Sequence, residues 1–292
     1  MGRIELAGPD YRAAVTGLLQ RIRLADPTGG LWEAADFQWW WRRVRPSDEL
    51  GQALWLGEDG RPVAAFVLTD WDGSWEAEVI LAPGSEAGLF AEVWRHAFDR
   101  IVALGLAAVT VRARDDDPAL VAALKGAGFV EAGDADTACW LAAGQRPAVS
   151  ALPAGFRLRS RAETADRPHH MIGRNGEHVA ERLAECSIYD PELDLLVEAP
   201  DGDVAGYALF WPDPVTRVGL VEPMRTEDGY QRLGIGRHLL TAGIDRLAER
   251  GCERMKVSYM NENAGARALY LGAGFSPHDT SCVYRGAFAR QL

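Results

Sequence analysis

The residues best suited to chemistry lie in a glycine-rich turn, Gln231–Gly236, which precedes a run of residues with helical spacing. A turn of this kind at a helix start exposes several backbone N–H groups without hindrance from a Cβ atom, and the helix dipole adds positive potential there. A pyrophosphate fits such a nest of N–H groups. Glycines also cap helices and turns, so the flanking elements must decide the assignment.

The segments on either side of the turn have the patterns of a strand and a helix. Thr216–Met224 is predicted to be a strand, and because Pro223 cannot donate to a sheet ladder we expect the strand to bulge or splay there. After the turn, apolar residues recur at helical spacing from Ile235 to Leu247, and Gly251 stands where a C-terminal cap belongs. The order strand, phosphate turn, helix is therefore predicted.

A second strand and helix are predicted next. Met255, Val257 and Tyr259 alternate with polar residues, as in a half-buried strand, and Asn261–Gly274 is predicted to form a short helix that ends in Gly-Ala-Gly-Phe. The phosphate turn is thus followed by the start of an α/β unit.

With these two motifs in place, the chain resembles the GNAT acetyltransferase superfamily. The family's phosphate loop reads Gln/Arg-x-x-Gly-x-Gly/Ala, and its later helix reads Asn-x-x-Ala-x-x-x-Tyr-x-x-x-Gly-Phe. The residues that match the second motif are Asn263, Ala266, Tyr270, Gly274 and Phe275. Two motifs in the right order are more specific than either alone. The resemblance implies an α/β (α+β) fold in which helices flank a mixed, mostly antiparallel, twisted sheet.

The resemblance also implies acetyl-CoA as co-substrate and no metal. Because acetyl-CoA is anionic, we expect Arg232 and Arg237 to form a small basic patch at the loop. The residues that the resemblance assigns to cofactor binding are Met224, Arg225, Thr226, Gln231, Arg232, Leu233, Gly234, Ile235, Gly236, Arg237, Asn263 and Ala266.

Two residues are candidates for acid–base catalysis. An amine that attacks a thioester needs a free lone pair, a polarised carbonyl and a proton for the departing thiolate. Tyr270 matches the tyrosine with which many family members protonate the thiolate, and Glu222, just before the expected splay, could deprotonate the ammonium directly or through water. The alternatives are a core tyrosine beside Phe275 and a solvated or structural carboxylate.

An internal repeat divides the chain into two halves. At an offset of half the length, Gly126–Phe129 falls on Gly272–Phe275, which predicts two tandem domains of one fold, 1–145 and 153–292, joined by a linker near 144–154. At the same offset Glu86 replaces Arg232 and Phe90 replaces Gly236, which opposes pyrophosphate binding. We therefore interpret the first domain as degenerate and structural, and the second as catalytic.

Composition limits the partners. The 292 residues carry a formal net charge of -11, which disfavours nonspecific nucleic-acid binding. Four scattered cysteines without a Cys-x-x-Cys pair indicate neither a disulfide framework nor a zinc site. No apolar run reaches the length of a membrane span, so no membrane partner is expected, and a cytoplasmic monomer or homodimer is predicted.

Two further groups of residues are candidates for parts of a site. His169, His170 and His178 lie in the region that lines the acceptor site in this family. Their spacing fits no zinc motif and no acidic or cysteine partner completes one, so surface or helix-face histidines are the preferred interpretation. Nine of the ten tryptophans lie in the first half, including Trp39–Trp41. They are expected to fill a core and an interdomain contact, although one could wall the acceptor cavity.

The predicted function is acetyl transfer from acetyl-CoA to a primary amine of a small molecule by direct attack in a ternary complex. Tandem architecture with an active second half also resembles mycothiol synthase, which acetylates a cysteinyl pseudodisaccharide, although Lys256–Met260 departs from its pattern. A further alternative is a sensor module that binds acyl-CoA without turnover, against which Tyr270 and Glu222 argue.

Overall fold

In a computed structural model that describes residues 2–86 and 88–288, the chain folds into two compact units. The first comprises the chain up to Phe37, Val44–Asp136 and the chain from Asp279 onward. The second comprises Gln38–Arg43 and Thr137–His278. Each unit is therefore built from segments that are separate in the sequence.

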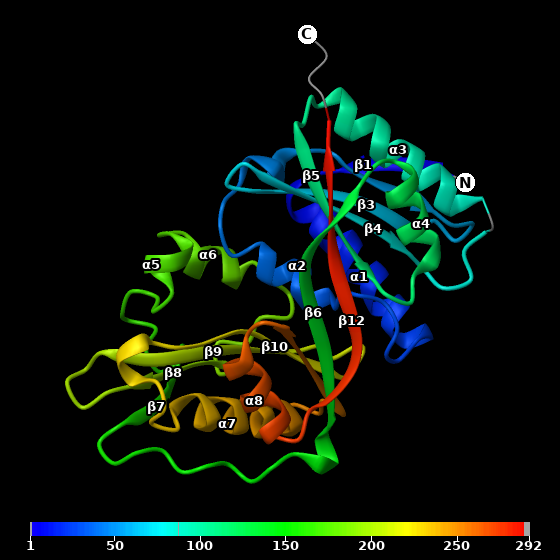
Figure 1. The fold of residues 1–292 in the computed structure, drawn as a ribbon. Coiled ribbons are helices and arrows are strands. Elements are labelled where there is room, and N and C mark those ends of the chain that lie inside the picture. The colour runs from blue at the N-terminus through cyan, green and yellow to red at the C-terminus, as the bar shows by residue number, and fades with distance from the viewer. Residues whose placement is uncertain (1, 87, 289–292) are drawn as a thin grey trace. The chain divides into compact units, whose positions relative to one another are not determined.

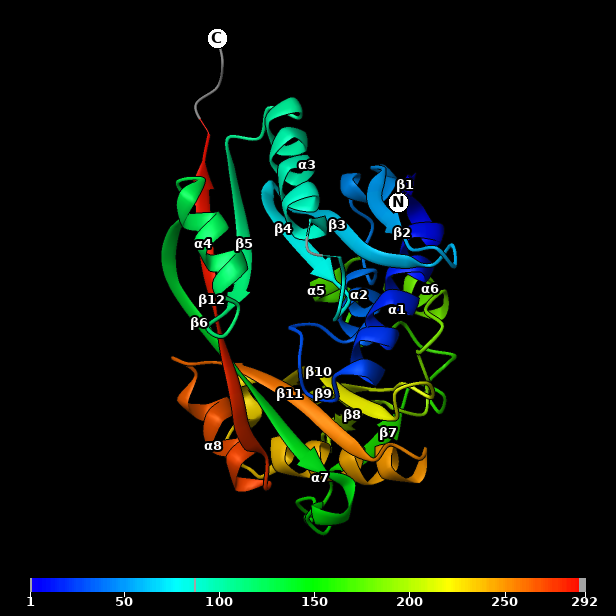
Figure 2. The ribbon, with the colours of Figure 1, turned by 90° about the vertical axis from the view of Figure 1, so that its right-hand side faces the viewer.

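The first half of the chain alternates between helices and strands (Figure 1). Its elements are β1 (Gly2–Leu6), α1 (Gly8–Ala25), α2 (Ala34–Trp40), η1 (Pro46–Glu49), β2 (Gln52–Leu56), β3 (Pro62–Trp71), β4 (Ser74–Leu81), α3 (Leu89–Ala103), β5 (Ala108–Arg114), α4 (Pro118–Gly126), β6 (Val130–Ala142) and η2 (Ala143–Gln145). In the first unit the strand order is β1-β2-β3-β4-β5-β12, with β4 and β5 parallel and the other registered neighbours antiparallel. Figure 2 shows α1 and α3 on opposite sides of β3 and β4.

The second half repeats this plan. Its elements are β7 (Arg157–Ser160), α5 (Ile172–Asn175), α6 (Val179–Ala184), β8 (Asp194–Glu198), β9 (Val204–Pro212), β10 (Val218–Thr226), η3 (Asp228–Tyr230), α7 (Ile235–Glu249), β11 (Arg254–Met260), α8 (Ala264–Gly272) and β12 (Ser276–Ala287). The strand order in the second unit is β6-β11-β10-β9-β8-β7. Figure 1 shows α7 on one face of this sheet and the short helices α5 and α6 on the other.

The core of the second unit lies between its sheet and α7. The apolar residues that predicted this helix are fully covered, with Leu239, Leu240, Ile244 and Leu247 at 0% exposure. The helix ends as predicted, because Gly251 adopts a left-handed φ of 85° just beyond it. The mixed α/β fold expected from the sequence is confirmed.

The internal repeat is visible in the element boundaries. Shifting α3, β5 and α4 by 146 residues reproduces the bounds of α7, β11 and α8 residue for residue. The two helices that follow the parallel strand pair also begin alike, since Asp117 accepts a hydrogen bond from the Leu120 N–H at 3.0 Å and Asn263 accepts one from the Ala266 N–H at 3.0 Å. The duplication therefore extends to the helix caps.

The last strand of each half completes the other unit. β12 pairs antiparallel with β5 of the first unit, from Ser281 opposite Arg114 to Ala287 opposite Ala108. The residues of β6 from Thr137 onward belong to the second unit, where this strand neighbours β11. Each half thus contributes part of its final strand to the other unit.

The segment expected to link two domains is anchored within the second unit. Residues 146–153 have no regular secondary structure, but the Ser150 N–H donates to Thr241 Oγ1 at 3.0 Å and Arg146 pairs with Asp245 at 2.7 Å. Both partners lie on α7. The chain passes between the units inside β6, upstream of this segment, because a continuous strand replaces the expected linker.

Candidate active site

The site begins at an irregularity in β10. The pairing with β9 shifts between Val221, which lies opposite Phe210, and Met224, which lies opposite Ala208, so β10 carries one extra residue. This is the bulge that Pro223 predicted. The Trp211 indole N–H donates to the backbone oxygen of Glu222 at 2.6 Å. The bulge therefore frees a carbonyl from the ladder and gives it a side-chain donor instead.

The parallel pairing of β10 and β11 is short. Its register covers Val218–Leu220 opposite Arg254–Lys256, whereas β10 continues to Thr226 and β11 to Met260. Backbone groups of Glu222–Thr226 on the β11 side thus lie beyond the registered pairs. This is the splay expected from the sequence, and an extended arm could bond to the strand there.

The glycine-rich turn has the backbone of an anion nest. Gly234 caps α7 in the left-handed conformation with φ 86°, and Arg232 also has a positive φ of 65°. The first N–H groups of a helix have no partner within it, so those of Ile235, Gly236 and Arg237 point out of the helix start. A Cβ atom on Gly234 would meet no atom within 4 Å, so the space above the turn is open.

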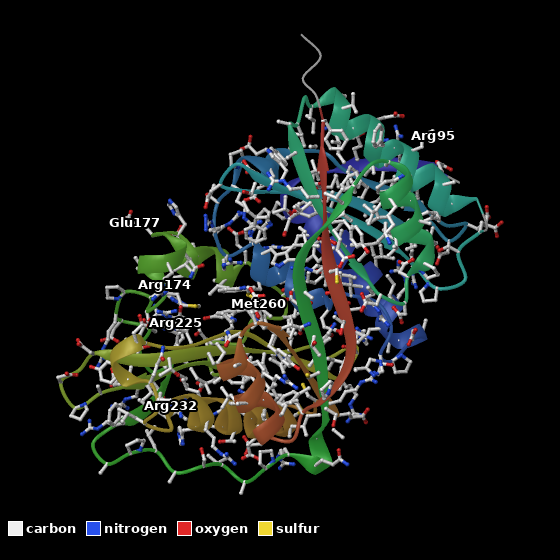
Figure 3. All side chains as sticks on the ribbon, in the orientation of Figure 1. Arg95, Arg174, Glu177, Arg225, Arg232 and Met260 are labelled. Carbon is white, nitrogen blue, oxygen red and sulfur yellow. The ribbon has the colours of Figure 1, made fainter. Side chains whose placement is uncertain are left out.

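Close packing fixes the turn against β10. A Cβ atom on Gly236 would lie 3.0 Å from Thr226 Oγ1 and 3.8 Å from Met224 Cε, so those two side chains face α7. Alternation along the strand places Arg225 on the opposite face. Figure 3 shows Arg232 on the α7 side of the sheet, and Arg225 with Arg174 on the α5 side.

Arg225 is engaged with carboxylates. Its Nε donates to Glu227 at 2.9 Å, and Glu227 also accepts from Arg174 at 3.0 Å. The hydrogen bond to Glu227 raises the pKa of Arg225. Partial burial opposes ionisation of Glu227, but the hydrogen bonds from Arg225 and Arg174 outweigh it and lower the pKa of this carboxyl group. Because the Arg225 side chain is engaged, only its backbone is expected to bind the cofactor, and this stays a prediction.

Asn263 has a structural task as well as its predicted place in cofactor binding, because its side chain caps α8. We expect Asn263→Ala to lower the free energy of unfolding by about 1 kcal/mol, since the Ala266 N–H loses its acceptor. Asn263→Asp should retain stability, because Asp117 caps α4 in the same way. Urea denaturation of both variants tests this; equal stability of the alanine variant would contradict it.

Tyr270 is buried at the end of α8, with 7% exposure. Its ring centroid lies 6.5 Å from that of Tyr259 and 6.2 Å from that of Phe275. Burial and then the charge of Glu222 raise the pKa of the Tyr270 hydroxyl above its ordinary value. The two residues proposed as acid and base are therefore electrostatically coupled, and Tyr270 keeps its proton at neutral pH.

The histidines differ from their expected surface placement. His169 is buried and the side chain of His170 is 4% exposed, whereas His178 is exposed at the start of α6. Asp194, at the start of β8, lies 3.0 Å from His169 Nε2 and 3.2 Å from His170 Nε2, and accepts from the Tyr189 hydroxyl at 2.9 Å. The interpretation of His169 and His170 as surface or helix-face residues was wrong, because both side chains are enclosed beside Asp194. The sequence did not indicate this acidic partner, which lies 24 or more residues away.

The hydrogen bonds of His169 favour a carboxylate partner over a metal ion in the cluster of His169, His170 and Asp194. The Met171 N–H donates to His169 Nδ1 at 3.2 Å, so His169 Nε2 carries the proton toward Asp194. A metal-binding imidazole has the reverse arrangement, in which the other ring nitrogen donates. Burial opposes ionisation of Asp194, but the interactions with His169 and His170 outweigh it and lower its pKa. The expected absence of a metal stays a prediction.

Sequence reasoning missed a contribution from the first half of the chain. Gln38 Nε2 donates to Ser187 Oγ at 2.8 Å, and Gln38 Oε1 accepts from the Ile188 N–H at 2.9 Å. Within the same segment, Trp39 packs edge-on against Trp211, with 6.5 Å between ring centroids. Gln38–Arg43 thus supports the tryptophan that holds the Glu222 carbonyl. In the sequence, the tryptophan cluster Trp39–Trp41 was the only indication that this segment contributes, and no local pattern indicated where it would pack.

Comparisons with known proteins find relatives that match most of the chain. A model of the acetyltransferase (GNAT) family matches residues 157–275. A mycothiol acetyltransferase of Clavibacter michiganensis is 30% identical over 270 residues, 84% of each chain, and one of Kineococcus radiotolerans is 29% identical over 97% of this chain and 96% of its own. A tandem GNAT protein from the clavulanic acid biosynthesis pathway has a similar fold, with a TM-score of 0.72, 17% identity and 98% coverage of both chains.

The fold and these matches define an acetyltransferase built from two related halves. The chain belongs to the GNAT family of acetyltransferases. Among the described residues, no helix is long and apolar enough to cross a membrane.

Proposed function

We propose that the second half of the chain transfers an acetyl group from acetyl-CoA to a primary amine of a small molecule. The observation that carries the proposal is the combination of an open, left-handed turn at the start of α7 with a bulged strand beside it. The turn would hold the pyrophosphate, and the free backbone of β10 would bond the pantetheine arm and the acetyl carbonyl. The residues named for this task are Met224, Arg225, Thr226, Gln231–Arg237, Asn263 and Ala266.

The reaction is a direct attack in a ternary complex. Glu222 takes a proton from the acceptor ammonium, directly or through water, and the freed lone pair attacks the thioester carbonyl. Backbone N–H groups near the bulge stabilise the negative oxygen that forms. As the C–S bond breaks, Tyr270 donates its proton to the departing thiolate. The attacking nitrogen then gives its second proton to the tyrosinate, directly or through water, and the acetyl group remains on nitrogen as an amide.

The coupling of the two side chains favours this order of events. In the free protein the Glu222 charge helps to raise the pKa of Tyr270, second to burial. When Glu222 accepts the amine's proton its charge is lost, which removes that contribution and makes the phenol a stronger acid. Deprotonation of the acceptor thus prepares the group that protonates the leaving thiolate.

A second candidate for the acceptor comes from the relatives. Proteins that match at least 84% of this chain at 29–30% identity are named mycothiol acetyltransferases. A cysteinyl pseudodisaccharide is therefore the acceptor to test first after simple amines. Cytoplasmic location, and a monomeric or homodimeric state, stay predictions.

The test is release of free CoA from acetyl-CoA with a panel of amines, in the intact protein and in Glu222→Gln. We expect turnover with at least one amine and a loss of roughly a hundredfold to ten-thousandfold in the variant at pH 7. The loss should shrink at high pH, where the amine is already deprotonated. Binding of acetyl-CoA without turnover of any amine would instead support the sensor alternative.

A further inference from the structure

The first unit contains a cavity that the proposed reaction does not use. Its volume is about 450 Å³, within the range of small-molecule pockets. Residues near the ends of β4 and β5 line it. The registered pairing of these two strands covers only Trp75 opposite Val109 and Glu76 opposite Thr110, and the strands diverge in Figure 2. The ends of α1, β4 and β5 and the start of α4 supply the walls.

One carboxyl group is buried in the wall of this cavity. Glu78, on β4, is 4% exposed, and its Oε2 accepts a hydrogen bond from the Trp32 indole N–H at 2.7 Å. Around it the wall is apolar, with Ile22, Ile80 and Leu120 among its residues. A carboxylate in such surroundings is costly unless a positive charge accompanies it.

The positive charges in the wall already have acidic partners. Arg112 lies 2.8 Å from Asp136, and Arg114 pairs with Asp116 at 2.6 Å and with Asp279 at 3.4 Å. The other charged groups that line the cavity or act on Glu78 are acidic: Asp26, Asp117, Glu76 and Asp36. An ionised Glu78 would therefore leave an excess of negative charge, which a cationic ligand would balance.

We propose that this cavity binds a small primary amine with an apolar body, the ammonium group against Glu78 and the body against the aliphatic wall. The site lies outside the catalytic half and goes beyond the proposed function. An acyl-CoA is a poorer fit, because Phe90, which stands in place of Gly236, forms part of the wall, and Glu86 stands in place of Arg232.

Binding should release a proton. Burial, and then the charge of Glu76, raise the pKa of Glu78 to about 8 against the opposing effects of Trp32 and Arg112. At pH 7 the free cavity thus holds a neutral carboxyl group, and the amine in solution is an ammonium ion. The complex contains an ammonium and a carboxylate, so the carboxyl proton passes to the buffer.

Calorimetric titration of phenethylamine into the intact protein, in phosphate and in Tris at pH 7, measures both affinity and proton release. We expect saturable binding, release of nearly one proton, and much weaker binding of 2-phenylethanol, which lacks the charge. Glu78→Gln should weaken binding by roughly tenfold or more and abolish the proton release. Because glutamine resembles the neutral acid, the variant's thermal midpoint at pH 7 should stay close to that of the parent protein.

Two control variants locate the site. The first control, Asp26→Asn, changes another carboxylate in the same wall. Asp26 accepts a hydrogen bond from the Gly29 N–H at 2.8 Å, and asparagine can keep this bond. Proton release should therefore persist in this variant. Glu222→Gln should likewise leave it unchanged, since any amine bound by the catalytic half would depend on Glu222 instead. Three results would overturn the proposal. They are proton release that survives Glu78→Gln, the absence of saturable binding, and displacement of the amine by acetyl-CoA at a second site per chain.

Discussion

Tyr270→Phe should lower the rate of CoA release by roughly tenfold to ten-thousandfold while leaving the affinity for acetyl-CoA nearly unchanged. The substitution removes only the hydroxyl proton that we assign to the leaving thiolate. The ring remains packed against Phe275 and Tyr259, so the fold should be preserved. Leu124 fills the equivalent place in the first unit at 0% exposure, which shows that this position needs no hydroxyl for packing.

Steady-state kinetics with the best amine of the panel measures the effect, and Tyr259→Phe is the matched control. Tyr259 is buried to the same 7% exposure but has no assigned role in the reaction, so its variant should keep the parent rate. If Tyr270→Phe also keeps the parent rate, Tyr270 is a core residue and the acid must be sought elsewhere.

The second large effect is expected at the phosphate turn, where Gly234→Trp should abolish acetyl-CoA binding. The indole would occupy the open space above the turn and cover the N–H groups at the start of α7. A left-handed φ of 86° also strains any side chain at this position, so a control must carry the same strain. Gly251→Trp meets that need, because Gly251 has φ 85° and equally open surroundings at the far end of the same helix.

Calorimetry with acetyl-CoA compares the two variants. One site per chain, lost in Gly234→Trp and kept in Gly251→Trp, is the expected result. Two sites in the parent protein would mean that the first unit also binds the cofactor, despite Glu86 and Phe90. Binding that survives Gly234→Trp would place the pyrophosphate away from this turn.

Local patterns predicted the elements around the turn correctly. A proline in a strand forces an irregularity wherever the strand pairs, so the bulge after Val221 could be expected from Pro223 alone. Likewise Gly251 and the apolar spacing of α7 set the bounds of that helix, and the repeat placed the equivalent helix of the first half. In each case the cause lies within a few residues of the effect.

The features that sequence reasoning missed depend on distant partners. The strand β12 has the same alternating pattern whether it pairs with β5 or with β11, so its exchange leaves no local trace. Asp194 meets His169 and His170 only after β8 is placed in its sheet. The catalytic and cofactor-binding assignments themselves stay predictions, because they concern molecules that the sequence does not contain.

The exchange of strands has a consequence for how the protein is made and cut. On the ribosome the first half emerges before the strand that pairs with β5, because β12 follows all the other elements of the second half. The first unit must therefore wait with an open sheet edge. For the same reason a fragment that starts at residue 153 would lack the β6 residues of its own sheet and would carry β12 without a partner. The two halves are duplicates in sequence, yet each compact unit contains strand residues that come from the other half.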